Sequence, residues 1–384
     1  KFDGGTNTSI VNGDTVSYAN LKADLDGSNY TGDATFDNIF MDLANINSGY
    51  SSVDIRDNYG SNNIRVVAKD YLRNIKNIIS SSGNDTLYGD AGANTLKGGL
   101  GDDTLMGRGG NDYLDGEGGN NTVSYSYVST SSGVIVDLKN GTGVVAVGDE
   151  DTLVNIQNVI GTKNSDLIKM GTVAGALESI ANSIDGGDGI DTISYEYYTA
   201  NLTINLGAGS VATGDNDLLT SIENAIGGSG NDTVSYELND SAIYASLESG
   251  RSSQNDTLKD VENLHGSKYN DILEGDDKDN TLFGGSGDDI LIGLEGADTL
   301  DGGEGVDLAS YETSSAVEIN LKHNYAEGGE ATGDKFVNIE GIKGSKEADT
   351  IVGDNNSNLI YANDGDDRVS GNDGDDIIFG GKGN

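Results

Sequence analysis

A nine-residue period constrains this chain more strongly than any other feature of its sequence. Residues 266–310 divide without a gap into the nonamers GSKYNDILE, GDDKDNTLF, GGSGDDILI, GLEGADTLD and GGEGVDLAS. Position six is Asp or Asn and position eight is apolar in every unit. Five unbroken units in each of two blocks exclude chance and simple low complexity. The 17 units occupy residues 80–124, 161–169, 186–194, 227–235, 266–310 and 344–379.

The period predicts a stack of short strands and tight turns. Positions seven to nine suit a three-residue strand with one inward side chain, such as Leu105 between Thr104 and Met106. Positions one to six suit a turn, because glycine adopts positive φ at low cost. One unit cannot bury its apolar side chain alone, whereas stacked units form a solenoid with a ladder of such side chains. Stacking also superimposes the position-six carboxylates, and their mutual repulsion favours a bound cation.

Three units match a known family pattern best, namely 98–106, 284–292 and 302–310. They resemble the RTX family of hemolysin-type calcium-binding repeats, GGxGxDxUx, where U is large and apolar. The resemblance implies an all-β fold, a parallel β-roll or β-helix solenoid with Ca²⁺ between turns, interrupted here by five strand-loop inserts. It also implies that position-six oxygens and nearby carbonyls hold the ions. The predicted metal ligands are Asp85, Asn94, Asp103, Asp112, Asn121, Asp166, Asp191, Asp232, Asp271, Asn280, Asp289, Asp298, Asp307, Asp349, Asn358, Asp367 and Asp376.

Calcium is the cation that such a ligand set favours. Ca²⁺ takes about six to eight carboxylate and carbonyl oxygens, whereas Mg²⁺ demands a compact octahedron. The sequence has no DxDxDG loop with a Glu at the required offset, which argues against an EF-hand. An alternative is that these Asp residues merely favour turns, but that does not explain a fixed sixth position before an apolar eighth. The Asn units offer neutral oxygens, and we expect weaker or incomplete sites there.

A second, longer repeat lies between the nonamer blocks. Each of its five copies has a Ser-Tyr pair, an alternating strand that ends in Leu, and then an opening Asp followed by apolar residues at every third position. The spacing from the opening Asp to the next nonamer Asp is the same in all copies, whereas the stretch before the opening Asp varies in length. We expect a rigid rung and an elastic, loop-like part. The tyrosines are Tyr18, Tyr125, Tyr195, Tyr236 and Tyr311, and the opening Asp residues are Asp70, Asp151, Asp217, Asp256 and Asp334.

Several structural expectations follow from this second repeat. Each tyrosine should pack as a cap at a coil end rather than bind a ligand. The longest elastic part, residues 44–69, is predicted to be a loop, either a contact surface or a decorative one. Residues 171–183 are the only plausible helix. The predicted segments are an insert repeat at 1–79, a β-roll block at 80–124, three inserts with single nonamers at 125–265, a β-roll block at 266–310, an insert at 311–343 and a truncated β-roll block at 344–384.

The charge of the chain limits its partners. Its 64 acidic and 22 basic residues give a net charge of −42, which disfavours nucleic acid and anionic membranes. It has no Cys, and no apolar run approaches the ~18 residues of a transmembrane helix. Metalloprotease, nucleophile-elbow and P-loop motifs are not found, and His265 and His323 are expected to be solvated or structural. We therefore expect a protein that is not an enzyme.

The resemblance also implies a route to the outside of the cell. RTX proteins leave a Gram-negative cell unfolded by type I secretion and fold on extracellular calcium. We expect an extracellular structural or surface protein, an S-layer, adhesin or matrix component, that binds calcium ions and contacts either itself, in a lattice or filament, or cell-surface polysaccharide. A first alternative is the calcium-dependent export and folding region of an RTX toxin or secreted enzyme with its catalytic domain upstream. A second is a substrate-gripping module beside a polysaccharide-modifying enzyme, against which the charge argues.

Overall fold

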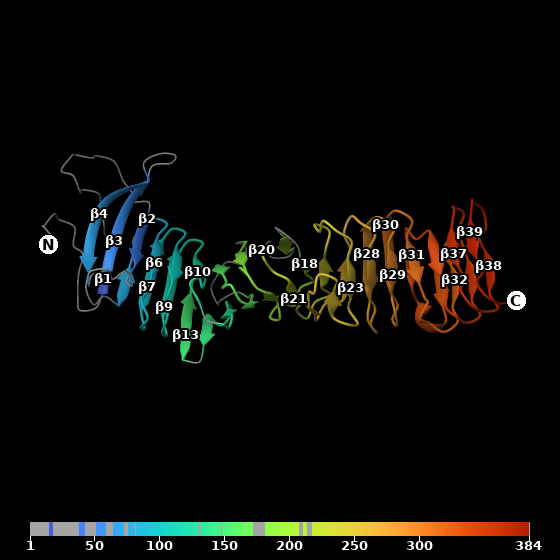
Figure 1. The fold of residues 1–384 in the computed structure, drawn as a ribbon, viewed down its shortest axis with the longest axis horizontal. Coiled ribbons are helices and arrows are strands. Elements are labelled where there is room, and N and C mark those ends of the chain that lie inside the picture. The colour runs from blue at the N-terminus through green and yellow to red at the C-terminus, as the bar shows by residue number, and fades with distance from the viewer. Residues whose placement is uncertain are drawn as a thin grey trace. The chain divides into compact units, whose positions relative to one another are not determined.

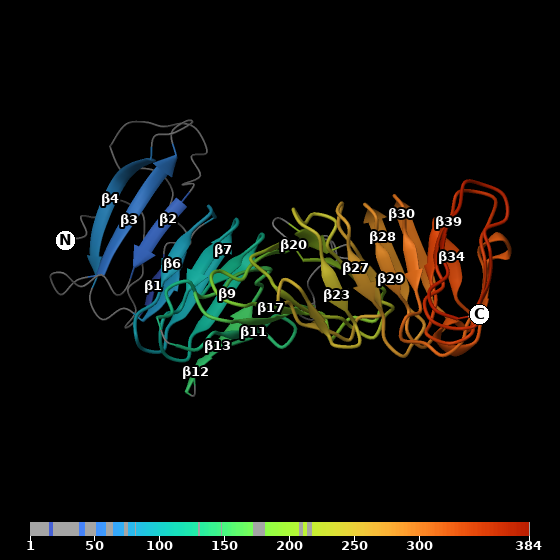
Figure 2. The same ribbon diagram turned by 45° about the vertical axis from the view of Figure 1, so that its right-hand side comes forward.

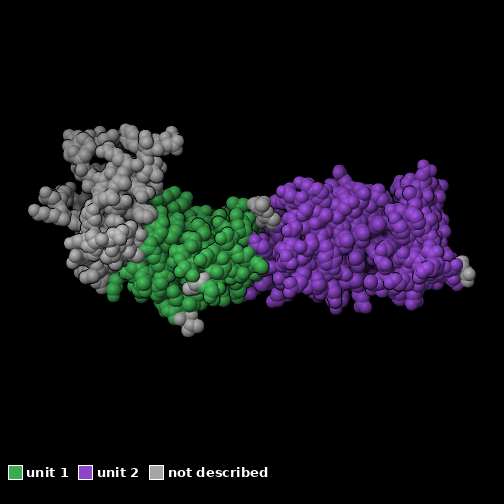
Figure 3. Space-filling view, in the orientation of Figure 1, with its two compact units in different colours: residues 1–193, 215–221 green, residues 194–214, 222–384 purple. Residues whose placement is uncertain are grey.

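The fold is known from a computed structural model (Figure 1). It describes residues 15–17, 38–42, 51–58, 64–72, 76–80, 82–129, 131–146, 148–171, 181–206, 210–212 and 217–383, with side chains from residue 76 onward except at 210–212. The chain forms two compact units, residues 1–193 with 215–221 and residues 194–214 with 222–384 (Figure 3). No helix in the described ranges is long and apolar enough to cross a membrane.

The nonamers form the rungs of a parallel solenoid, as predicted. Strand β29 (Ile290–Ile292) pairs in parallel with β27 (Ile272–Glu274), so that Leu291 lies beside Leu273, its counterpart two nonamers earlier. Successive nonamers therefore alternate between two sheets, and one coil contains two nonamers (Figure 2). Position eight is the core position: Leu273 and Leu291 are 0% exposed. Each such leucine contributes roughly 1.5–3 kcal/mol by burial.

Unit 1 contains two sheets. The first has the order β1 (Thr15–Ser17), β5 (Asn77–Ile79), β7 (Thr95–Leu100), β9 (Tyr113–Gly118), β13 (Asp149–Val154), β12 (Thr142–Ala146), β11 (Ile135–Asp137), β15 (Leu167–Lys169) and β17 (Thr192–Ser194). The second has the order β4 (Ile64–Leu72), β3 (Ser51–Asn58), β2 (Asn38–Asp42), β6 (Thr86–Tyr88), β8 (Thr104–Met106), β10 (Thr122–Ser124), β14 (Asn158–Ile160), β16 (Ser183–Asp185) and β20 (Asp217–Thr220).

Unit 2 contains three further sheets. The first runs β18 (Thr203–Asn205), β22 (Thr233–Ser235), β26 (Asn263–His265), β28 (Thr281–Ser286), β30 (Thr299–Glu304) and β34 (Lys335–Val337). The second runs β24 (Arg251–Ser252), β23 (Tyr244–Ser246), β27, β29, β31 (Leu308–Ser310), β35 (Gly341–Lys343), β37 (Leu359–Tyr361) and β39 (Ile377–Phe379). The third runs β33 (Tyr325–Glu327), β32 (Glu318–Asn320), β36 (Thr350–Val352) and β38 (Arg368–Ser370). The remaining elements are β19 (Ser210–Ala212), β21 (Asn224–Ile226), β25 (Leu258–Lys259) and the 3₁₀ turns η1 (Leu321–His323) and η2 (Gly329–Ala331).

The inserts form additional rungs that carry antiparallel hairpins. The alternating strand of an insert pairs in parallel with the next nonamer strand, as β11 does with β15 and β32 with β36. The variable part folds back as a hairpin in several copies, for example β32 with β33 and β11 with β12. The prediction of a loop at 44–69 is wrong where the structure describes it, because β3 and β4 form an antiparallel hairpin there. The helix expected at 171–183 falls largely on residues 172–180, which lie outside the described residues.

Candidate metal centres

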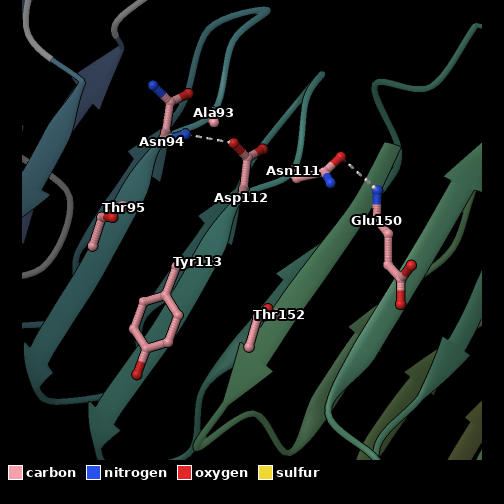
Figure 4. A pocket seen from close by; sticks show the side chains of 8 residues that line it. All are labelled: Ala93, Asn94, Thr95, Asn111, Asp112, Tyr113, Glu150 and Thr152. Carbon is pink, nitrogen blue, oxygen red and sulfur yellow. Dashed lines mark hydrogen bonds between the residues drawn. The ribbon is translucent and has the colours of Figure 1, made fainter. Parts of the chain in front are cut away.

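The position-six side chains form columns along the turns of the solenoid. The backbone N–H of one position-six residue donates to Oδ1 of the position-six residue two nonamers later. Thus Asp271 donates to Asp289 at 2.7 Å, and Asp289 donates to Asp307 at 2.8 Å. Figure 4 shows one such pair, in which Asn94 donates to Asp112 at 2.8 Å. The same bond links Asp85 to Asp103, Asp103 to Asn121, Asn280 to Asp298, Asp349 to Asp367 and Asn358 to Asp376.

Six of the predicted ligands in the three long blocks have a second carboxylate oxygen without a hydrogen-bond partner. Within the described residues, Oδ2 of each is buried and unsatisfied. A buried carboxylate oxygen without a partner is strongly unfavourable, and native proteins satisfy such atoms with protein groups, water or an ion. A hard cation fits this oxygen because it supplies the missing positive charge. The six residues are Asp103, Asp112, Asp289, Asp298, Asp307 and Asp367, and we call their turns the open turns.

The pKa values of open-turn carboxyls also show that burial disfavours their ionised form. Burial, the largest cause, raises the pKa of Asp103 to about 8 and that of Asp298 to about 7. Neighbouring carboxylates raise them further, whereas the backbone N–H bond to each acid opposes the shift. The metal-free column therefore tends to hold protons near neutral pH. A divalent cation removes that tendency, because it stabilises the ionised form.

The backbone of the open turns has a shared conformation. Positions two and four both have positive φ, as at Gly285 (109°) and Gly287 (125°). A methyl group at Gly287 would lie 2.6 Å from the carbonyl carbon and 2.7 Å from the oxygen of Tyr269, in the preceding coil. A methyl group at Gly284 would likewise collide with Asp289 Oδ2. The same added methyl group at Gly284 would also meet the carbonyl oxygen of Gly302, so the absence of a side chain there lets this carbonyl and the carboxylate of Asp289 lie close together.

Backbone carbonyls must supply most of the ligands for an ion in these turns. Within the described residues, no group of three or more Asp, Glu or His side chains is gathered as a metal cluster. Ca²⁺ accepts backbone carbonyls as readily as carboxylates and tolerates irregular geometry. Each open turn presents one unsatisfied carboxylate oxygen, and in the turns of Asp289 and Asp307 a backbone carbonyl of the following coil lies close to it, so the donor atoms suit calcium.

The other predicted ligands occupy the same columns with a different environment. In eight of them a donor of the same turn already binds a side-chain oxygen, which is Oδ2 of an Asp or Oδ1 of an Asn. We call the turns of these eight residues the closed turns. In one example, Ser345 N–H donates to Asp349 Oδ2 at 2.7 Å and its hydroxyl donates to Oδ1 at 2.8 Å. The eight residues are Asp85, Asn94, Asp166, Asp232, Asp271, Asn280, Asp349 and Asn358. The last three predicted ligands, Asn121, Asp191 and Asp376, also lie in the columns, where their Oδ1 atoms accept from Asp103, Asp166 and Asn358.

Residues of the inserts extend the columns. Asp298 N–H donates to Asp334 Oδ1 at 2.9 Å, and Asp307 N–H donates to Glu340 Oε2 at 3.0 Å. Asp151, Gln157 and Glu262 do the same in other inserts. Sequence reasoning identified the opening Asp residues but gave them no site role, and it missed the Glu and Gln residues. The sequence does contain a pattern that could have identified these Glu and Gln residues. An acidic or amide residue stands six positions after the opening Asp in four of the five copies.

Four of the five tyrosines of the Ser-Tyr pairs are buried, in keeping with the predicted packing role, and Tyr18 lies outside the described residues. Tyr125, Tyr195, Tyr236 and Tyr311 are at most 1% exposed. The hydroxyl of Tyr125 donates to Asp151 Oδ2 at 3.1 Å. His265 packs at 4.5 Å from the ring of Phe283, and burial lowers its pKa. His323 lies in η1.

Two protein-family models match the chain. The model of the RTX calcium-binding nonapeptide repeat (4 copies) matches residues 77–105, 88–123, 260–291, 274–309 and 352–384. The model of the peptidase M10 serralysin C-terminal region matches residues 159–273. No curated protein matches the chain.

Proposed function

The chain is a calcium-binding RTX protein with Ca²⁺ as its cofactor. On that premise we propose that it is secreted and serves as a structural or surface component outside the cell. In this role it is an S-layer, adhesin or matrix element, exported unfolded by a type I route from a Gram-negative cell. Calcium entering the open turns then converts the chain into a solenoid. The observation that carries this proposal is the column of buried carboxylates with unsatisfied second oxygens, such as Asp289 and Asp307.

The columns link folding to location. Without calcium, folding places ionised carboxylates in a dry environment, where both desolvation and mutual repulsion oppose the compact state. An ion that binds only the folded chain stabilises it in proportion to the logarithm of its concentration over Kd. Extracellular calcium modules have a Kd of about 10⁻⁴–10⁻³ M, far above cytoplasmic calcium. The chain should thus stay unfolded inside the cell and fold outside it.

The insert hairpins support a contact role. They rest on rungs of the solenoid, which gives them a rigid base, and they present aromatic rings to solvent. Tyr244 on β23 is 42% exposed and Tyr325 on β33 is 41% exposed. Exposed aromatic rings on rigid scaffolds suit contacts with polysaccharide or with a second copy of the chain.

Electron microscopy of the purified chain in millimolar Ca²⁺ and after chelation tests the proposal. We expect sheets or filaments in calcium and their loss in chelator. Binding to purified surface polysaccharide, measured in calcium, would support an adhesin role instead of a lattice. Dispersed particles without polysaccharide binding would overturn the structural proposal. A far-UV circular dichroism spectrum and hydrodynamic radius unchanged by EGTA would overturn calcium-dependent folding itself.

The second candidate is an export and folding region of a secreted enzyme. The match of residues 159–273 to the C-terminal region of serralysin peptidases favours it, because that region is not the catalytic part. In this case calcium-loaded particles stay dispersed, and the chain promotes secretion and folding of a catalytic domain to which it is joined. Under both candidates we propose that this chain is not itself an enzyme.

A further inference from the structure

The closed turns are not scattered along the chain. The first nonamer after each insert is closed, and so is the second nonamer of each of the three long blocks. The six open turns follow later in those blocks. In residues 266–310, for example, the turns of Asp271 and Asn280 are closed, and those of Asp289, Asp298 and Asp307 are open. The turn of Asp191, in the single nonamer 186–194, has the same positive φ at Gly187 and Gly189 and also follows a closed turn, that of Asp166.

Closed turns with Asp at position six hold the carboxylate with their own donors. In the turn 266–271, Ser267 donates its backbone N–H to Asp271 Oδ2 and its hydroxyl to Asp271 Oδ1 at 2.9 Å. Thr162 makes the same two bonds to Asp166, at 2.6 and 3.0 Å. The described position-two and position-four residues of the closed turns lack the positive φ of the open turns. The different backbone path brings the position-two N–H to the acid.

In closed turns with Asn at position six, the side-chain amide both accepts and donates a hydrogen bond. Asn280 Oδ1 accepts from Asp276 N–H at 2.7 Å, and its Nδ2 donates to the carbonyl of Glu262 at 2.8 Å. Asn358 repeats this with Asp354 and with the carbonyl of Glu340, at 2.9 and 3.3 Å. The amide nitrogen has no counterpart in Asp, so Asn is the residue that this rung requires.

The coil that precedes a closed turn explains why such turns occur directly after the inserts. Asp271 Oδ1 accepts from Ile243 N–H at 2.7 Å, and Asp349 Oδ1 accepts from Val317 N–H at 2.8 Å. The two donors directly precede the insert strands β23 and β32, and this part of an insert lacks the glycine-rich turn. An ion between two coils needs carbonyls from both, and the insert side offers no such turn. The carboxylate above an insert must therefore be satisfied by protein groups.

We propose that the eight closed turns bind no calcium and that the six of them in the long blocks form a metal-free first coil on which the calcium-binding open turns stack. The inserts after blocks 80–124 and 266–310 thus end a calcium column with their own acid and amide side chains, and the first nonamer after every insert is a closed turn. This inference rests on the calcium-dependent folding proposed above and deepens it, because it states which predicted sites hold ions and which do not.

The test counts calcium ions per chain in matched variants. Asp271→Asn and Asp289→Asn remove the same charge from neighbouring turns of one column. Bound calcium is measured by native mass spectrometry and by equilibrium dialysis of the whole chain in millimolar Ca²⁺, with circular dichroism to confirm folding. We expect Asp289→Asn to lose at least one ion and Asp271→Asn to lose none. Loss of ions from Asp271→Asn equal to that from Asp289→Asn would overturn the inference.

A conversion of turn type keeps the test decisive if Asp271→Asn does not fold. The double variant Gly285→Ser/Gly287→Tyr gives an open turn the position-two and position-four residues of the 266–271 turn. We expect it to bind at least one ion fewer while Asp289 remains in place. An unchanged ion count would contradict our assignment. A wild-type chain that binds no calcium would instead refute calcium-dependent folding, so the two failures are distinguishable.

Discussion

The phenolic oxygen of Tyr311 donates a 2.7 Å hydrogen bond to Asp334 Oδ2, and both side chains are almost completely buried. Asp334 Oδ1 accepts at the same time from Asp298 N–H. The opening Asp of this insert is thus satisfied on both oxygens without a metal, at the end of a calcium column. Burial nevertheless raises its pKa to about 6, while the tyrosine bond opposes that rise.

Tyr311→Phe should destabilise the calcium-loaded chain by about 1–3 kcal/mol, because it leaves a buried carboxylate oxygen without its donor. Urea unfolding in millimolar Ca²⁺ measures the change. Tyr325→Phe is the matched control, because the Tyr325 hydroxyl also donates to an acid, Glu327, but on the exposed face of a hairpin. The control should change stability by less than ~0.5 kcal/mol. Equal effects of the two variants would show that the buried bond has no special role.

The calcium-free chain should gain structure when the pH falls. The pKa values of Asp103 and Asp289 rise on folding from 3.8 to about 8 and about 7, mainly because of burial. A carboxyl with a raised folded-state pKa stabilises the fold fully below its unfolded pKa, near 4, and loses this contribution as pH rises through 7 and 8. Calcium binding has the opposite dependence, because the ion displaces the protons, so affinity should increase with pH.

Circular dichroism of dialysed, calcium-free protein at pH 5 and pH 9 measures this effect. We expect more β-structure at the lower pH and a stronger calcium dependence at the higher pH. The variant Asp289→Asn/Asp298→Asn should show a smaller pH effect, since it lacks two of the buried carboxyls. Identical spectra at both pH values would contradict the expected role of these protons.

Gly287→Ala should destabilise the calcium-loaded fold by more than about 2 kcal/mol. Its φ of 125° is unfavourable for a residue with a side chain, and the added methyl group would meet the Tyr269 carbonyl at 2.7 Å. Gly380→Ala is the control, because a methyl group there meets nothing within 4 Å. Thermal unfolding in calcium compares the two. A loss of stability as small as that of the control would mean that the turn accommodates the methyl group by a small shift of its backbone.

The nonamer rungs were predictable because their structure is local and repeated. Each unit contains its own turn, its own apolar residue and its own acid, so the pairing of Leu273 with Leu291 follows from the period alone. The rungs formed by the inserts were harder to predict from the sequence. The bond from Asp112 N–H to Asp151 spans a hairpin of variable length, and no fixed period reveals it.

The difference between open and closed turns was also hidden, because it depends on backbone angles that do not follow residue type alone. Arg108 and Leu294 adopt positive φ at position two, at 73° and 67°, where glycine is the usual residue. Gly228 occupies the same position without positive φ, and its N–H caps Asp232 Oδ2 at 2.7 Å. A consensus of residue types therefore treats both kinds of turn as equal sites.

Asn280→Asp separates the consensus interpretation from the structural one. The nonamer consensus predicts that Asp at this position is a better calcium ligand, whereas the structure predicts that the substitution lowers the stability of the fold. Asn280 Nδ2 donates to the Glu262 carbonyl at 2.8 Å and to Asp276 Oδ1 at 3.1 Å, and a carboxylate oxygen in its place would face both acceptors. The variant should lose about 1–3 kcal/mol of stability and gain no calcium ion. Asn270→Asp adds the same charge one turn away and keeps the oxygen that accepts from Asp288 N–H, so it should be nearly neutral. Urea unfolding and ion counting in calcium measure both variants, and a gain of one bound ion by Asn280→Asp would favour the consensus interpretation.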